Sequence, residues 1–222
     1  ANRFKALINS LEILRSREDV KKFSDVIPHL PNVKKWVNST KLLSNESLLT
    51  EFKQHKTSDF ERVVNWSNDI DRAVKEKSKY ISMFSGVTQS LQKMSLGADL
   101  AVISQTPSSV IEQDWKKNEI ISYIFNIFGQ GSGTKQVQLT CVINGKYETG
   151  NCLMIGDAWG DLEAAKTMGI LFYPINPGFE VQSWEQFNNE SLQRFFDGTY
   201  AGEYESGLID RFASILPAEI NW

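Results

Sequence analysis

The sequence predicts an α/β protein in which an all-helical module precedes a parallel sheet. Residues 1–80 carry apolar side chains at the three- and four-residue spacing of amphipathic helices and almost no strand pattern. From about residue 85 onward, short apolar runs alternate with helical segments, which is typical of a parallel sheet buried on both faces. We therefore expect two domains, a helical module over residues 1–82 and an α/β core over residues 83–222.

The helical module shows three amphipathic segments. The first carries an apolar stripe of Phe4, Leu7, Ile8, Leu11 and Leu14. Pro31 is expected at the first position of the second helix, which places Val33, Trp36 and Val37 on one face. Ser58 and Glu61 have capping-box spacing and predict the start of the third, whose stripe is Phe60, Val63, Val64, Ile70 and Val74.

The core is expected to contain four strands with helices between them. The strands are predicted at 98–104, in a stretch ending near Phe128 and Gly129, at 152–155 and at 170–175. The helices are predicted at 85–95, 107–117 (with Val110, Ile111 and Trp115 as its apolar face), 134–143, 160–168, 183–196 and 200–215.

Composition restricts the classes of partner. A net charge of −3 and a pI near 5.5 give no electrostatic reason to expect nucleic acid or an anionic membrane surface. No apolar stretch approaches the ~20 residues of a membrane-spanning helix, and residues 1–20 lack the layout of a secretory signal. Cys141 and Cys152 lie in apolar contexts without CxxC spacing, so we expect reduced core residues and a cytoplasmic location.

Polar residues follow three of the apolar runs, where ligands of an open parallel sheet collect. Ser104 and Gln105 end the first run, and a hydroxyl beside the amides that open the next helix suits phosphate oxygens. A glycine-rich loop ends at Lys135, a cation suited to neutralising phosphate or an acidic nucleophile. Asp157 and Asp161 place two carboxylates in one loop, as a divalent cation such as Mg²⁺ requires.

Each of these signals also has a purely structural interpretation. A serine at a strand end can cap a helix, a lysine at a helix start can be a solvated surface residue, and paired aspartates can complement a helix dipole. Trp159, inside the acidic loop, can line a site or pack in the core.

Taken in order, Ser104, Lys135 and the Gly156-Asp157-x-x-x-Asp161 segment resemble motifs II, III and IV of the haloacid dehalogenase (HAD) superfamily. The resemblance covers roughly residues 60–222 and points to bacterial HAD-type hydrolases. It is carried by residues 104–107, 129–135, 154–158, 172–175 and 200–204.

The resemblance implies a HAD-like Rossmannoid core and a helical C1 cap, inserted after the family's first motif. It also implies that Ser104, with Gln105 beside it, binds the phosphoryl group and that Lys135 stabilises the phosphorylated intermediate. Asp157 and Asp161 would hold Mg²⁺ directly or through water, with Lys135 and Asp157 as catalytic residues. The implied activity is a Mg²⁺-dependent phosphohydrolase that acts on a small phosphorylated metabolite through an aspartyl-phosphate.

The family's first motif, a strand followed by Asp-x-Asp, has no counterpart in the sequence. Asp69 and Asp71 have the Asp-x-Asp spacing, yet they lie in a helical stripe, so we expect a solvated helix face there. The segment from Phe195 to Thr199 resembles the end of the motif but has Phe195 at the nucleophile position, so we expect a helix that ends at a glycine. We therefore expect a chain that has lost its N-terminal segment, and with it the strand between those ending at Ser104 and Asp157.

The 222 residues alone are expected to lack turnover, and their own missing N-terminal segment is an expected partner. Two alternatives stay open: a catalytically dead phosphate- or metal-binding scaffold, and another HAD chemistry such as phosphomutase activity or C–Cl or C–P cleavage.

Overall fold

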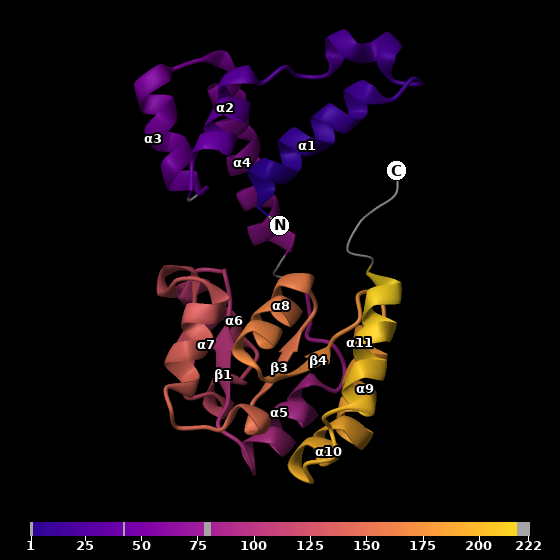
Figure 1. Ribbon diagram of the computed structural model, residues 1–222. Helices are drawn as coiled ribbons and strands as arrows, with labels where there is room; N and C mark the ends of the chain where they lie inside the picture. The colour runs from indigo at the N-terminus through magenta and orange to yellow at the C-terminus, as the bar shows by residue number, and fades with distance from the viewer. Residues whose placement is uncertain (1, 42, 78–80, 217–222) are drawn as a thin grey trace. The chain divides into compact units, whose positions relative to one another are not determined.

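The computed structural model describes residues 2–41, 43–77 and 81–216, and its chain divides into two compact units, Ala1–Ile81 and Ser82–Trp222 (Figure 1). The units correspond to the helical and the α/β parts of the sequence.

The first unit is helical throughout its described residues. Its elements are α1 (Arg3–Ser16), the 3₁₀ helix η1 (Lys21–Val26), α2 (Pro31–Ser39), α3 (Asn45–His55) and α4 (Ser58–Lys77). Pro31 is the first residue of α2, as predicted. Trp36 is at the centre of the core, where its ring lies 5.2 Å from that of Phe4 and 6.3 Å from that of Phe60, both in edge-on geometry.

Asp59 joins α4 to α2. Its Oδ2 accepts hydrogen bonds from the backbone N–H groups of Asn32 (2.8 Å) and Val33 (3.3 Å), so the carboxylate caps a helix other than its own. The predicted capping box is wrong, because Ser58 already lies inside α4 as its first residue and Thr57 precedes the helix. Sequence spacing alone could not show that the acid beside Ser58 serves a different helix.

The expected solvated Asp-x-Asp face is confirmed within α4. Asp69 pairs with Arg72 of the next turn at 2.7 Å, and Asp71 pairs with Arg3 at 2.6 Å. Val74 of the same predicted stripe is 60% exposed, so the buried stripe of α4 ends before it.

The second unit is an α/β layer structure (Figure 1). Its described strands are β1 (Ala101–Ile103), β2 (Asn126–Phe128), β3 (Leu153–Gly156) and β4 (Leu171–Pro174). Its helices are α5 (Val87–Ser95), α6 (Ser108–Lys117), α7 (Lys135–Ile143), α8 (Trp159–Met168), α9 (Glu180–Gln186), the π-helical turn η6 (Phe187–Ser191), α10 (Leu192–Phe196) and α11 (Glu203–Ile215). Short 3₁₀ turns lie at η3 (Ile121–Tyr123), η4 (Gln130–Ser132) and η5 (Thr149–Asn151).

The strands form two parallel pairs. β1 pairs with β2, with Val102 opposite Ile127, and β3 pairs with β4, with Met154 opposite Phe172. Neither β1 nor β2 is hydrogen-bonded to β3 or β4 in the described part of the chain.

Helices cover both faces of the strands. Ile155 and Tyr173 pack in one apolar cluster with side chains of α5, η6 and α10. Their neighbours Met154 and Phe172 pack in a second cluster with side chains of α7 and α8. Since successive side chains of a strand point to opposite faces, this is the buried parallel arrangement that the non-alternating apolar runs predict. The predicted α/β fold class is confirmed.

Three details of the second unit differ from expectation or refine it. Val110 is 53% exposed although its neighbour Ile111 is buried, because adjacent helical residues point about 100° apart.

Cys141, expected in the core, is exposed on α7. Cys152 is half-buried, and burial raises the pKa of its thiol. The predicted helix end is confirmed by Gly198, which follows α10 with φ of +70°.

No helix within the described ranges is long and apolar enough to cross a membrane.

Candidate functional site

The predicted site residues follow the carboxyl ends of three strands. Ser104 comes directly after β1, Gly129 directly after β2 and Asp157 directly after β3. Lys135 is the first residue of α7, and Asp161 lies in the first turn of α8. Hydrogen bonds or an ion pair engage four of the five predicted residues, namely Ser104, Gln105, Lys135 and Asp161.

The loops after β1 and β2 are tied together. The backbone N–H of Gln130 donates to the carbonyl of Thr106 at 3.0 Å, and Gln105 Nε2 donates to the carbonyl of Gly133 at 3.2 Å. Gly129 is required at this contact, since a Cβ there would lie 2.6 Å from the backbone nitrogen of Ser108 and 2.8 Å from the Thr106 carbonyl oxygen. The glycine-rich loop is therefore held against the Ser104 loop by backbone contacts.

Gln138 is a site residue that the sequence analysis did not identify. It is fully buried on α7, and its Nε2 lies 3.2 Å from the carbonyl of Ser104, 2.9 Å from that of Gly129 and 3.2 Å from that of Gly133. Its Oε1 is buried without a hydrogen-bond partner in the described chain. The available signal was its position three residues after Lys135, which places both side chains on one face of α7.

Lys135 and Asp161 link the loop after β2 to the loop after β3. Lys135 Nζ forms an ion pair with Asp161 Oδ1, and the two side chains are 24% and 7% exposed. Asp161 Oδ2 accepts from the backbone N–H of Ala158 at 3.2 Å, so the same carboxylate caps α8. Asp161 thus combines the expected capping role with a close contact to the predicted cation.

Gly156 explains part of the Gly-Asp-x-x-x-Asp spacing. A Cβ at this position would lie 2.5 Å from Asp161 Cβ and 2.6 Å from Asp161 Cγ. Only a glycine lets the carboxylate of Asp161 fold back over the end of β3.

Ser104 and Asp157 are the other two predicted site residues. The Ser104 side chain accepts from the N–H of Thr106 at 3.1 Å and is half-buried. Asp157 is exposed at the end of β3, and its carboxylate has no ion-pair or hydrogen-bond partner among the described residues. Asp157 is therefore the acid of this loop that is free to take a ligand.

Trp159 packs in the core and does not line the site. Its Nε1 donates to the carbonyl of Leu216 at 2.8 Å, and its ring lies 5.5 Å from that of Phe212 on α11. Of the two interpretations of this residue, the structure supports packing.

The outer edge of β4 is closed by side chains and by a proline. Phe172 N–H donates to Glu205 Oε1 at 2.8 Å, its carbonyl accepts from the hydroxyl of Tyr200 at 2.7 Å, and Pro174 has no N–H to pair. On β2, the N–H of Ile127 donates to the side chain of Asn126 at 2.8 Å. Neither outer edge offers these groups to another strand.

The opposite edges of β1 and β3 are open. Parallel pairing directs alternate residues to each side of a strand. The N–H of Ser104 donates to the carbonyl of Phe128 in β2, and the carbonyl of Gly156 accepts from the N–H of Ile175, directly after β4. The backbone groups of Ile103 and Ile155 consequently face away from the paired strands, and the described chain places no strand there. Each pair keeps one edge that can accept a further strand.

The side chains of the site are of the type that binds Mg²⁺, but they are fewer than a complete set of ligands. Asp157 and Asp161 supply carboxylate oxygens, which hard divalent cations prefer. Within residues 2–41, 43–77 and 81–216, no group of three or more His, Cys, Asp or Glu side chains is placed to hold a metal. The residues present fit Mg²⁺ as a partial ligand set.

A comparison with known protein families identifies a relationship for this chain. A family model described as haloacid dehalogenase-like hydrolase matches residues 9–175, about three quarters of the chain and parts of both units. Among curated proteins, none matches this chain.

Proposed function

The chain belongs to the haloacid dehalogenase-like hydrolase family, and we propose that it is a Mg²⁺-dependent phosphohydrolase of a small phosphorylated metabolite. The observation that carries the proposal is the Lys135–Asp161 ion pair beside the exposed Asp157 and the Ser104 loop. This arrangement offers a hydroxyl, a cation and a free carboxylate in the loops that follow β1, β2 and β3, and these are the groups that phosphoryl transfer requires.

Each residue has a proposed role. The hydroxyl of Ser104 and the amides that open α6 bind phosphoryl oxygens, with Gln105 beside them. Lys135 neutralises charge on the phosphoryl group, and Asp161 holds the Lys135 ammonium in place. Asp157 would hold Mg²⁺, because the Asp161 carboxylate is already occupied by Lys135 and Ala158. When bound, Mg²⁺ would supply positive charge to the phosphoryl oxygens.

The nucleophile is proposed to come from a strand that fills the open edges of β1 and β3. An aspartate at the end of such a strand attacks phosphorus, the alcohol of the substrate leaves with a proton, and water then hydrolyses the aspartyl-phosphate to aspartate and phosphate. The open edges of both strands support this placement. The helical unit is proposed to act as the cap, and the free cysteines agree with a proposed cytoplasmic location.

The proposal is tested by removing the cation of the site. In the protein expressed at the length its gene encodes, Lys135→Ala should lower kcat on p-nitrophenyl phosphate by roughly 10²–10³, as expected for loss of a preorganised group facing phosphoryl charge. Lys166→Ala is the matched control, since Lys166 is an exposed lysine in the last turn of α8 and should leave kcat unchanged. Equal rates for the two variants would remove Lys135 from the mechanism.

A further inference from the structure

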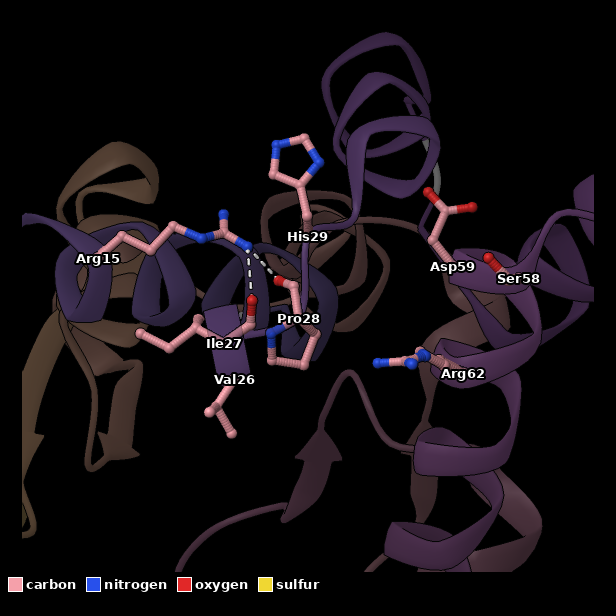
Figure 2. Close-up of a pocket in the computed structure, with 8 residues that line it drawn as sticks. All are labelled: Arg15, Val26, Ile27, Pro28, His29, Ser58, Asp59 and Arg62. Atoms are coloured by element: carbon pink, nitrogen blue, oxygen red, sulfur yellow. Dashed lines mark hydrogen bonds between the residues drawn. The ribbon is translucent and has the colours of Figure 1, made fainter. Parts of the chain in front are cut away.

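The helical unit holds a cavity that the proposed hydrolysis does not use. Its volume is ≈ 440 Å³, and its walls come from the end of α1, the segment before α2 and the first turns of α4 (Figure 2). The lining residues are Arg15, Val26, Ile27, Pro28, His29, Ser58, Asp59 and Arg62.

The one described carboxylate in this lining is already engaged. Asp59 is 5% exposed, and its oxygens accept from the backbone N–H groups of Asn32 and Val33, from Asn32 Nδ2 at 3.2 Å and from the Thr57 hydroxyl. Burial raises the pKa of Asp59, but these hydrogen bonds outweigh burial and hold the pKa below its usual value. The Asp59 charge is therefore directed at the start of α2, where it stabilises that helix.

The arginines of the lining keep unused donors. Arg15 Nη2 donates to the carbonyls of Ile27 (3.3 Å) and Pro28, which fixes one wall (Figure 2). The other guanidinium nitrogens of Arg15 have no hydrogen-bond partner among the residues that the structure describes. Arg62 is exposed, and in Figure 2 its side chain extends from α4 toward Pro28. Among the side chains that the structure describes, neither Arg15 nor Arg62 forms an ion pair.

We propose that this cavity binds a small organic anion whose carboxylate or phosphate-type head group is held by Arg15 and Arg62. Guanidinium groups recognise both head groups through paired, charge-assisted hydrogen bonds. The cavity volume is in the range of small-molecule sites, which leaves room for an organic body beyond the head group. Val26, which is 79% exposed, and Ile27 supply apolar surface for that body.

The chain contains its own reporter for this site. His29 lines the cavity, and His55, the other of the two histidines in the sequence, lies on α3 beside Glu51 outside it. Phenylphosphonate and benzoate, titrated separately, test the two head groups by ¹H–¹³C NMR of the imidazole rings, with benzyl alcohol as the neutral control. We expect the His29 signals to shift saturably with at least one of the anions while the His55 signals stay in place and benzyl alcohol shifts neither.

Two arginine variants separate the site from general charge effects. Arg62→Gln should weaken anion binding by about tenfold or more, as expected for loss of a charge-assisted pair. Arg72→Gln removes the same charge from the same helix, outside the lining, and should leave binding unchanged. Unsaturable shifts, equal shifts at both histidines, or equal binding by the two variants would overturn the proposal.

The site is independent of the proposed hydrolysis. Lys135→Ala should leave the His29 titration unchanged, because Lys135 belongs to the other unit. A protein without phosphatase activity that still shows the His29 response would refute the proposed function and support the anion site.

Discussion

Replacing Gly156 with alanine should displace the Asp161 carboxylate from the end of β3. The added Cβ would lie 2.5 Å from Asp161 Cβ, 2.6 Å from its Cγ and 2.8 Å from its Oδ2, distances far below van der Waals contact. The φ of Gly156 is outside the left-handed region, so alanine meets no backbone strain and the cost is steric.

The size of the effect follows from what Asp161 holds. Overpacking at a close contact costs about 1–3 kcal/mol. Moving the carboxylate also breaks its bonds to Lys135 and to the N–H of Ala158, and leaving buried polar groups without partners costs about 1–3 kcal/mol more. We expect the free energy of unfolding to fall by about 2–6 kcal/mol in Gly156→Ala.

Urea unfolding followed by circular dichroism measures this change. Gly160→Ala is the control, because Gly160 lies in the first turn of α8 with nothing within 4 Å of an added Cβ. That substitution should leave stability unchanged or raise it by up to about 1 kcal/mol. A Gly156→Ala protein as stable as the control would refute the close packing of Asp161 on Gly156.

Two further predictions concern buried polar groups. Gln138→Leu should lower the free energy of unfolding by about 1–3 kcal/mol, because three carbonyls lose their shared donor. Gln136→Leu on the same helix should change it by less than about 0.5 kcal/mol. Urea unfolding of both variants measures the two effects. Equal effects would contradict the role given to Gln138. Asp59 has a lowered pKa in the folded chain, so its contribution to stability is present above the unfolded pKa of about 3.9 and is lost as pH falls through the folded value. Unfolding measured from pH 6 to pH 2 should therefore show a loss of stability below about pH 4 that is smaller in Asp59→Asn, and identical slopes would contradict the assignment.

The sequence predicted the α/β layer well because apolar runs and helix periodicity are local signals. The runs ending at Ser104 and Gly156 are strands, and the residues that follow them lie at strand ends as expected. The ion pair of Lys135 with Asp161 agrees with the predicted position of both residues after strand ends, since loops at the carboxyl ends of parallel strands lie on the same side of the layer.

The features that were missed depend on contacts between distant segments. Gln138 looks like an ordinary polar helix residue until the loops after β1 and β2 fold over it. Cys141 lies two residues after buried Leu139, and a rotation of about 200° on the helix carries it to the solvent side. Asp59 caps a helix that begins 28 residues before it, which no local capping pattern can show.

The separation of the strands into two pairs also required the structure. An apolar run predicts a strand, and it does not say which neighbour that strand pairs with. The closed outer edge of β4 and the open edges of β1 and β3 emerge only from the register and from side chains such as Tyr200 and Glu205.

The central claim is that this fold performs Mg²⁺-dependent hydrolysis of a phosphomonoester. The most direct measurement is the release of inorganic phosphate from p-nitrophenyl phosphate by the protein at the length its gene encodes, with Mg²⁺ and with excess chelator. The account predicts turnover that needs Mg²⁺ and that falls by roughly 10²-fold or more in Asp157→Asn, with Asp197→Asn, an exposed acid after α10, as the unaffected control. Turnover that is insensitive to chelator and to Asp157→Asn, or no turnover at all with Mg²⁺ present, would contradict it.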